Sequence, residues 1–426
     1  MQDFLDFISF SDPNVRMVVL GTISIAVGAS LVGTFTYLRK QALVGDAISH
    51  SIFPGVCFAF ILSGTKDPLY LIIGAFISGW LSVFLIEWVT NRTKLKPDTA
   101  IAFILTFFFG VGTMLMSYIQ NSGNGAQSGL DQYLCGKAAA IGNDDVWIFG
   151  SIGIALLLLI VFFYKTFKLI SFNPDFAKSL GVKVRLFEIV LSSLTVLSIA
   201  SGIQAVGVVL MAALLITPAT IARQWTHNLK VMLVLAVIAA ALSGFVGAYI
   251  SYTAPSMPTG PWIVIVLSTL ALLSVFLAPN RGIIARVMKQ INNKKQIRRE
   301  NLLKAIYHCM EDDQVNQISA ARILQRRSFG TNELERGLRG LIRKSLLLTN
   351  NGQFQFTEHG EKEAKRIVRL HRLWEMYLTQ RMNFSEDHIH GTAESIEHII
   401  TPELELALEK ELGFPKTDPH NKQIPY

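Results

Sequence analysis

Long apolar runs without a single charge fill the chain before Pro279, and they restrict its possible folds more than any other feature. The run "GTISIAVGASLVGTFTYL", which ends just before Arg39, is one of them. A helix needs roughly 20 such residues to cross a bilayer, where it satisfies its own backbone hydrogen bonds. Hydrophobic residues make up 51% of the chain and charged residues only 16%, which excludes an ordinary soluble enzyme. We therefore expect an all-α polytopic membrane domain over residues 1–282.

Eight or nine runs qualify as transmembrane helices. They lie near residues 16–38, 42–62, 68–90, 99–118, 147–168, 186–203, 206–222, 230–252 and 261–279. Lys and Arg gather in alternate loops, at 39–40, 91–96, 165–185 and from 281 onward. Because cytoplasmic loops retain Lys and Arg, this alternation predicts an external N-terminus and a cytoplasmic C-terminal part.

The stretch "GDAISH", residues 45–50, places an acid and an imidazole between two apolar runs. Asp46 and His50 are four residues apart, so on a helix they share a face and can hold one divalent cation. An ionised carboxylate at membrane depth requires a cationic partner, since otherwise it takes up a proton. The alternative is that Asp46 only caps a helix while His50 packs, and the spacing leaves both open. Pro54 predicts a broken helix, as is typical of transporter binding sites.

The stretch "SFNPDFAKSLGVKVRLFE", residues 171–188, is amphipathic and lies on the predicted cytoplasmic side. Pro174 suits the start of a short helix, and Gly181 suits its end. The pattern favours a helix that docks on a cytoplasmic partner. An ordinary basic loop remains the alternative.

Five motifs occur in an order that makes residues 10–280 similar to the permease subunits of ABC importers for zinc, manganese or iron. They are "LRKQALVGDAISHSIFPGV", "LDQYLCGKAAAIGNDD", "FNPDFAKSLGV", "VGVVLMAALLITPATIAR" and "GAYISYTAPSMPTGP". The resemblance implies a homodimer in a bacterial inner membrane, a separate ATPase subunit and an extracytoplasmic metal-binding protein. It assigns Asp46 and His50 to the metal path, and it forms the ATPase coupling helix from Asn173, Pro174, Asp175, Ala177 and Gly181.

The sequence itself contains no GxxxxGK[ST] phosphate loop. We therefore expect a transport subunit that is not an enzyme, with ATP hydrolysis in the separate subunit.

A basic connector, residues 283–299, follows the last apolar run and suits the surface of acidic membrane lipid. Residues 300–360 then have the pattern of a winged helix-turn-helix. The three predicted helices are "NLLKAIYHCMED", "QISAARILQRR" and "TNELERGLRGLIRKSLL", and a two-stranded wing turns at Asn351 and Gly352.

The second and third predicted helices carry the basic residues that would contact DNA, namely Arg326, Arg327, Arg336, Arg339 and Arg343. Glu333 and Glu335 in the first turn of the third helix argue against phosphate contact, and Gly337 and Gly340 weaken its interior. A winged helix used only for protein contacts therefore stays open.

Residues 361–426 place histidines and glutamates at helical spacings, which predicts a metal site. The candidate ligands are His371, Glu375, His390, Glu394, Glu397 and His398. Imidazole and carboxylate without cysteine suit Mn²⁺ or Fe²⁺ in this site. The transported ion can be Mn²⁺, Fe²⁺ or Zn²⁺, because Asp and His ligate all three.

This half resembles the metal-dependent repressors of the diphtheria toxin repressor family through "TEHGEKEAKRIVRLHRLWE", "ESIEHIITPELELALEKELGFP" and "DPHNKQIP". The resemblance implies a winged helix joined to a helical dimerisation domain, with metal held by the six candidate ligands. The family's first-helix ligand position holds Asn301 here, and Lys304 lies one turn further on, where an ammonium cannot ligate.

Together these patterns predict a metal permease with a cytoplasmic metal-sensing domain that regulates transport or transcription. The alternative is a membrane-tethered, or proteolytically released, metal-dependent transcription regulator.

Overall fold

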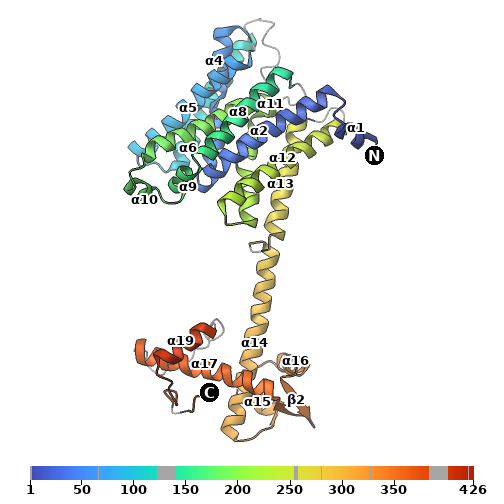
Figure 1. The fold of residues 1–426 in the computed structure, drawn as a ribbon, viewed down its shortest axis with the longest axis vertical. Coiled ribbons are helices and arrows are strands. Elements are labelled where there is room, and N and C mark those ends of the chain that lie inside the picture. Colours follow the sequence, from blue (N-terminus) through green and yellow to red (C-terminus); the bar gives the residue numbers. More distant parts are fainter. Residues whose placement is uncertain are drawn as a thin grey trace. The chain divides into compact units, whose positions relative to one another are not determined.

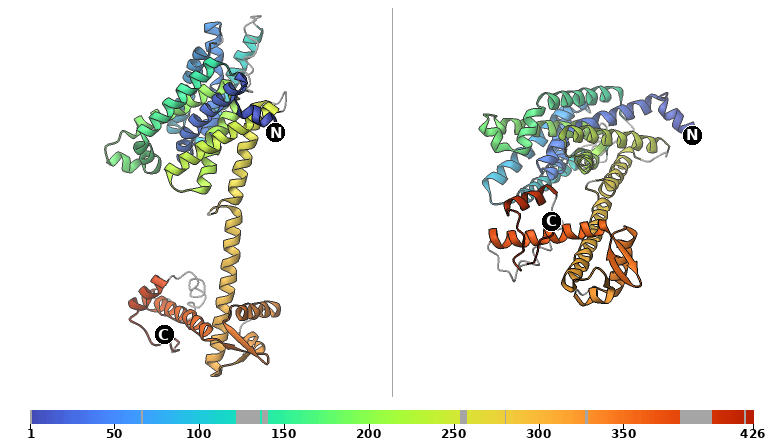
Figure 2. Two further views of the ribbon diagram at one scale, coloured as in Figure 1. Left: turned by 45° about the vertical axis from the view of Figure 1, so that its right-hand side comes forward. Right: turned by 60° about the horizontal axis from the view of Figure 1, so that its bottom comes forward.

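The computed structural model describes residues 2–65, 67–121, 136, 141–253, 258–279, 281–326, 329–382, 402–420 and 422–426. The chain divides into two compact units, which we call the membrane unit (Met1–Arg286) and the C-terminal unit (Val287–Tyr426). Helices form most of both units (Figure 1), and the further views show the same composition (Figure 2).

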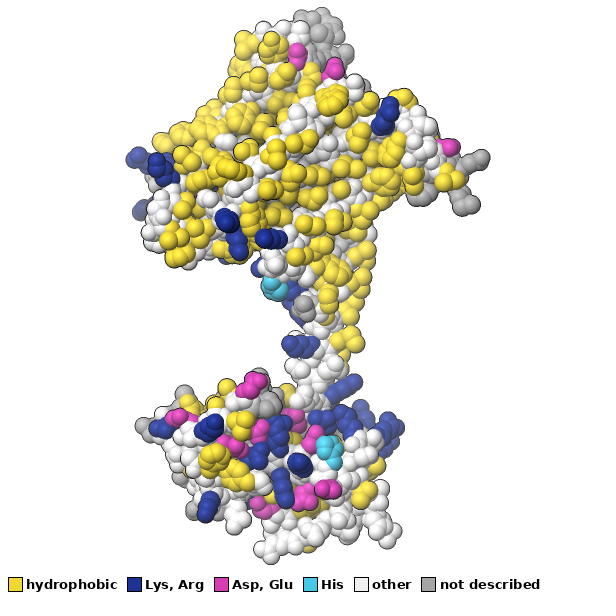
Figure 3. Space-filling view, viewed as in Figure 1, with side chains coloured by type: hydrophobic (Ala, Val, Ile, Leu, Met, Phe, Trp, Pro, Cys, Tyr) yellow, Lys and Arg dark blue, Asp and Glu magenta, His cyan; other side chains and the backbone are white. Residues whose placement is uncertain are grey.

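Helices account for all the regular structure described in the membrane unit, as predicted. They are α1 (Gln2–Ile8), α2 (Pro13–Leu38), α3 (Ala42–Ser51), α4 (Phe53–Ser63), α5 (Pro68–Arg92), α6 (Pro97–Asn121), α8 (Asn143–Phe162), α9 (Tyr164–Phe172), α10 (Pro174–Ser179), α11 (Val184–Trp225), α12 (Leu229–Thr253) and α13 (Thr259–Leu277). Among the described residues, eight stretches are long and apolar enough to cross a membrane, with α3 and α4 forming one of them. Hydrophobic side chains predominate on the surface of this unit (Figure 3), as lipid contact requires. The protein is therefore a multi-pass membrane protein.

The helix α11 folds back on itself, so the two spans predicted at 186–203 and 206–222 lie in one element. Gly207 interrupts it with φ of 79° and ψ of 169°, values that favour glycine. Thr195 hydrogen-bonds with Thr36 of α2 at 3.4 Å, while Leu215 lies against Gly33, one turn away on α2. Residues 195 and 215 would be about 30 Å apart on a straight helix, so the two halves of α11 lie side by side.

Close packing around α2 depends on the absence of side chains at particular glycines. A Cβ at Gly33 would overlap the carbonyl oxygen of Leu215, and one at Gly45 of α3 would overlap the side chain of the same leucine. The helices α2 and α11 therefore meet backbone to backbone, and the backbone of α3 meets the Leu215 side chain, as small residues permit in membrane proteins. This contact fixes α3, the helix that carries "GDAISH".

The C-terminal unit contains a three-stranded antiparallel sheet and the helices around it. The elements are α14 (Ile283–Asp313), β1 (Ile318–Ser319), α15 (Ala320–Arg326), α16 (Thr331–Arg343), β2 (Leu347–Asn350), β3 (Gln353–Phe356), α17 (Glu358–Met382) and α19 (Pro402–Glu411). The sheet order is β1-β3-β2, with Asn350 opposite Gln353 across the turn. Asn351 and Gly352 both have positive φ there, which closes the wing as predicted. The predicted winged helix-turn-helix is confirmed.

Two details of this unit differ from the sequence expectation. The basic connector and the first winged helix form one continuous helix, α14, because no Gly or Pro interrupts 283–313. Ile318 and Ser319, expected at the start of the second helix, instead pair with β3. Close packing explains the glycine at position 337, because a Cβ there would lie 2.7 Å from the Leu302 side chain of α14.

Candidate metal path and C-terminal metal site

The short helix α3 holds Asp46 and His50 on one face, as the spacing of four predicts. His50 Nε2 lies 3.8 Å from Asp46 Oδ1. The His50 side chain is 28% exposed and that of Asp46 is 47% exposed, so both remain accessible. A nitrogen and an oxygen at this separation can close on one small cation between them.

Neighbouring helices orient the His50 ring. It contacts Phe109 of α6 edge to face, with ring centroids 5.4 Å apart. Its Nδ1 is buried and, among the described residues, has no hydrogen-bond partner. After His50, the predicted break in the helix is small. Ile52 separates α3 from α4 but retains helical φ and ψ, and Pro54 lies in the first turn of α4.

Asp46 and His50 could supply two ligands to a cation, and the described part of the chain adds no third. Across the described residues, no group of three or more His, Cys, Asp or Glu side chains could hold a metal ion. A first-row ion takes four to six ligands, so a metal ion bound by this pair would need further ligands.

The predicted coupling segment forms the helix α10 between α9 and α11. Asn173 caps it by accepting a hydrogen bond from the Phe176 amide at 3.0 Å, Pro174 begins it, and Gly181 follows it with φ of 79°. Asp175 forms an exposed ion pair with Lys178 at 3.2 Å.

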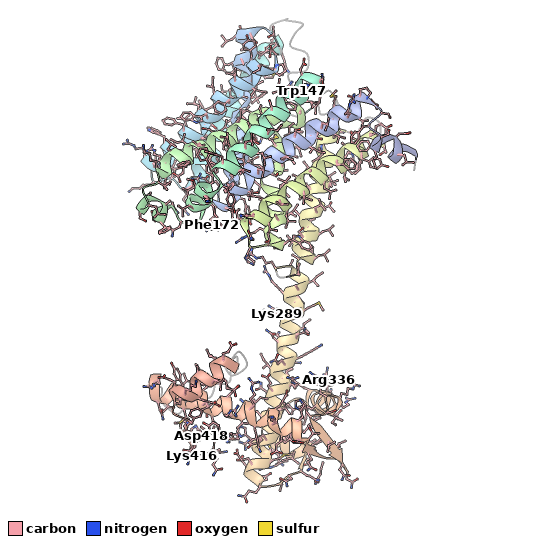
Figure 4. The ribbon with its side chains drawn as sticks, in the orientation of Figure 1. Trp147, Phe172, Lys289, Arg336, Lys416 and Asp418 are labelled. Atoms are coloured by element: carbon pink, nitrogen blue, oxygen red, sulfur yellow. The ribbon has the colours of Figure 1, made fainter. Side chains whose placement is uncertain are left out.

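One side of this short helix is anchored and the other is open. Ala177 is fully buried, whereas Phe176 and Leu180 are 52% and 60% exposed. Phe172, at the end of α9, is also exposed (Figure 4). Exposed apolar side chains on a polar loop are typical of a protein contact.

An ion pair between α2 and α11 was not predicted from the sequence. Arg39 donates from Nη2 to Glu188 Oε1 at 2.9 Å, with the Arg39 side chain 13% exposed. In the sequence, Arg39 indicates only the orientation of the chain in the membrane. The partners are 149 residues apart, and no local pattern links them.

In the C-terminal unit, His371 and Glu375 lie together on α17 and are both buried. His371 Nε2 is 3.0 Å from Glu375 Oε1, which confirms that the spacing of four places them on one face. They line a cavity of about 610 Å³ together with Lys304, His308, Asp418 and His420, among others. The other four predicted ligands, His390, Glu394, Glu397 and His398, lie outside the described residues.

A buried lysine faces the same imidazole. Lys304 of α14 is 3% exposed, and its Nζ is 3.5 Å from His371 Nδ1. The donor set of His371 and Glu375 fits a divalent transition ion, because both are hard or borderline ligands in a shared cavity. The ammonium of Lys304 opposes such an ion through like charge.

An ionic cluster joins α14, α17 and the C-terminal segment beside this cavity. The fully buried Arg372 donates to both Glu311 oxygens, at 3.0 and 2.5 Å, and lies 3.4 Å from Asp418. Burial raises the pKa of Glu311, but the nearby His308, 3.5 Å away, and the hydrogen bonds from Arg372 outweigh burial and lower that pKa to about 2. Burial also lowers the pKa of His308. The cluster therefore favours an ionised Glu311 and a neutral His308.

The arginines predicted to bind DNA differ in whether their side chains are free to contact a phosphate. Arg326 forms an ion pair with Asp312, and Arg327 lies outside the described residues. Arg336, Arg339 and Arg343 are exposed on α16 (Figure 4 labels Arg336). Their contact with DNA stays a prediction.

Comparison with protein families identifies the family of the membrane unit. The profile of the ABC 3 transport family matches residues 11–278, well over half of the chain. The chain belongs to the ABC 3 transport family. In this ABC 3 permease, residues 357–426 match a second profile, the metal binding and dimerisation domain of iron dependent repressors. Both resemblances drawn from the sequence are confirmed.

Individual relatives of the ABC 3 permease agree with this assignment. The manganese transport system membrane protein MntC of Bacillus subtilis is 36% identical over 380 residues, covering 89% of this chain and 87% of that protein. The zinc transport system membrane protein TroC of Treponema pallidum is 40% identical, covering 66% of this chain and 94% of that protein. The structure of PsaBC from Streptococcus pneumoniae has a TM-score of 0.60 and 31% identity, covering 67% of this chain and 99% of that chain.

Proposed function

We propose that this chain is the membrane permease of an ATP-driven importer of divalent transition metal, Mn²⁺, Fe²⁺ or Zn²⁺. The observation that carries the proposal is the pairing of Asp46 with His50 on α3, 3.8 Å apart and between two apolar runs. Relatives that are named manganese and zinc transport system membrane proteins support it.

The metal path lies between two copies of the chain. One copy offers two ligands, and a two-fold axis beside α3 would bring the same pair from the second copy. Two carboxylates and two imidazoles give four ligands, which suits a first-row ion. The partial exposure of both side chains supports a path that is completed by the second copy.

The two sides of the membrane unit contact different partner proteins. A separate ATPase docks on α10, where the exposed Phe176 and Leu180 supply apolar contact. An extracytoplasmic binding protein delivers the ion to the opposite side. The N-terminus lies outside and the C-terminal unit in the cytoplasm of a bacterial inner membrane. The Lys and Arg residues in alternate loops support this orientation, and nine crossings over the described residues, counting both halves of α11, agree with it.

The C-terminal unit senses the imported ion and adjusts transport. His371 and Glu375 would hold a Mn²⁺ or Fe²⁺ ion, with His390, Glu394, Glu397 and His398 completing the set. When bound, the ion supplies a concentrated positive charge to this cavity. Lys304 links that charge to α14, because its ammonium must move away from His371 to admit a cation.

Metal content of cells tests the transport proposal. A strain that lacks its own importers receives this chain with its ATPase and binding protein, and all first-row metals are measured by mass spectrometry. We expect one metal to rise with the parent chain and with Asp98→Asn, an exposed acid in the first turn of α6. Asp46→Asn should abolish the rise at equal expression. Unchanged accumulation with Asp46→Asn would remove Asp46 from the metal path.

A further inference from the structure

A groove of about 890 Å³ lies between α14 and α16, and neither metal role uses it. Five cationic side chains line it, namely Lys295, Arg298 and Arg299 of α14 and Arg336 and Lys344 of α16. Glu333 also lines it and pairs with Arg298, whose Nε is 3.1 Å from Glu333 Oε1. After this pairing, four positive charges remain in excess. A groove of this charge selects an anion.

Glycine spacing on α16 keeps the groove open. The helix approaches α14 closely at Gly337, where a Cβ would lie 2.7 Å from the Leu302 side chain. One turn later, a Cβ at Gly340 would meet no atom within 4 Å. The missing side chain at Gly340 therefore leaves space between two basic helix faces.

A buried N–H at the groove lacks an acceptor. Arg299 Nε is buried and has no hydrogen-bond partner among the described residues. A buried guanidinium N–H without an acceptor is costly, and the oxygens of a phosphate group are strong acceptors for it. The groove is therefore built for a phosphate better than for a simple halide.

The face of α14 that lines the groove continues as an exposed apolar stripe. Met288 and Ile291 are 60% and 46% exposed. Lys295 follows Ile291 by four residues and Met288 by seven, so all three share one helix face. A ligand that follows this face needs an anionic group at one end and hydrocarbon at the other.

We propose that the groove binds the phosphate headgroup of an acidic phospholipid, whose hydrocarbon lies along Met288 and Ile291. Along the chain, only residues 278–282 separate α14 from α13, the last apolar helix. Residues 281–299 contain seven Lys or Arg and no acid, a composition that anionic bilayer surfaces attract. Since Arg336 and Lys344 belong to α16, a bound lipid engages the helix that is predicted to read DNA.

Native mass spectrometry of the full-length chain in neutral detergent tests the proposal with phosphatidylglycerol as the probe. The groove variants are Lys295→Gln with Arg299→Gln, which removes charge, and Gly340→Leu, which fills the space. The matched control is Arg339→Gln with Arg343→Gln, two exposed arginines of α16 that do not line the groove. We expect retained phosphatidylglycerol to fall roughly tenfold in both groove variants and to stay at the parental level in the control.

Amide exchange of the same samples locates the site and checks folding. Phosphatidylglycerol should protect 290–300 and 333–344 in the parent chain, and exchange at α17 should be equal in all variants. Equal lipid retention in the parent and both groove variants would overturn the proposal. Glycerol phosphate binding as tightly as the lipid would also overturn it, because the ligand would then be a small phosphate ester. Protection of 290–300 and 333–344 by duplex DNA and not by lipid would overturn it as well. Lipid-independent cross-linking of Met288→Cys between two copies would assign the stripe to a dimer contact.

Discussion

Lys304 is the residue whose charge most affects how the C-terminal unit can respond to metal. Its ammonium is buried 3.5 Å from His371 Nδ1, and the other ring nitrogen lies 3.0 Å from Glu375. An ammonium only donates, so it acts as a cation beside the two donors that a metal ion would use. We therefore expect metal binding at His371 to be coupled to displacement of Lys304.

Replacing Lys304 by methionine should strengthen metal binding by about tenfold, because a like charge is removed from a partly desolvated site. Cobalt titration followed by visible absorption measures the affinity, in an Asp46→Asn background that disables the membrane pair. Lys362→Met, an exposed lysine of α17, is the control and should leave the affinity unchanged. Weaker binding in Lys304→Met would show that the lysine supports the site.

Glu311 makes the C-terminal unit sensitive to acid. Its pKa of about 2 lies below the usual 4.5, so its contribution to stability is complete above about pH 4.5 and is lost as the pH falls towards 2. Glu311→Gln should lower the free energy of opening measured by exchange of the α17 amides by about 2 kcal/mol at pH 7, and by less at pH 3. Amide exchange of the full chain measures this, with the exposed Glu335→Gln as control. An equal loss at both pH values would contradict the assignment.

At the scale of elements, the contact of α2 with the folded-back α11 determines whether the membrane unit assembles. Gly33→Ala places a Cβ on the Leu215 carbonyl, whereas Gly110→Ala on α6 meets no atom within 4 Å. We expect Gly33→Ala to destabilise the unit by roughly 1–3 kcal/mol or more, while Gly110→Ala is neutral. Thermal unfolding in detergent compares the two. Equal melting temperatures would indicate that α2 and α11 do not meet at Gly33.

The helix α10 should carry the contact with the ATPase. Phe176→Ser removes an exposed aromatic ring and should reduce co-purification of the ATPase by about tenfold, the loss typical of a contact residue at an interface centre. Leu404→Ser removes a side chain of equal exposure from the C-terminal unit and serves as the control. If both variants retain the ATPase equally, α10 is not its docking element.

Sequence patterns predicted the elements better than their three-dimensional contacts. Charge-free runs identify the spans, Pro174 and Gly181 delimit α10, and Asn351 with Gly352 predicts the wing, because each signal is local. The pairing of Arg39 with Glu188 and the approach of Lys304 to His371 join distant segments, so no local pattern contains them. The reversal at Gly207 was expected only as a gap between two spans, since a glycine alone does not specify a sharp bend.

At the scale of the whole molecule, one chain combines a membrane permease with a repressor-like domain. The ABC 3 match ends at residue 278 and the repressor match begins at 357, with α14 and the winged helix between them. Covalent linkage keeps the sensor at a fixed ratio to the permease. We therefore expect the C-terminal unit to act on transport by the chain that carries it.

Metal uptake into proteoliposomes tests this account most directly. The chain is reconstituted with its ATPase and binding protein, with ATP and a chosen concentration of Mn²⁺ trapped inside, and the initial uptake rate of labelled Mn²⁺ is measured. We expect ATP-dependent uptake that slows as internal Mn²⁺ rises in the parent chain, but continues at an unchanged rate in His371→Ala. An uptake rate that is independent of internal Mn²⁺ in both chains would contradict the proposed sensing role of the C-terminal unit. The absence of ATP-dependent uptake of Mn²⁺, Fe²⁺ or Zn²⁺ would contradict the proposed permease function.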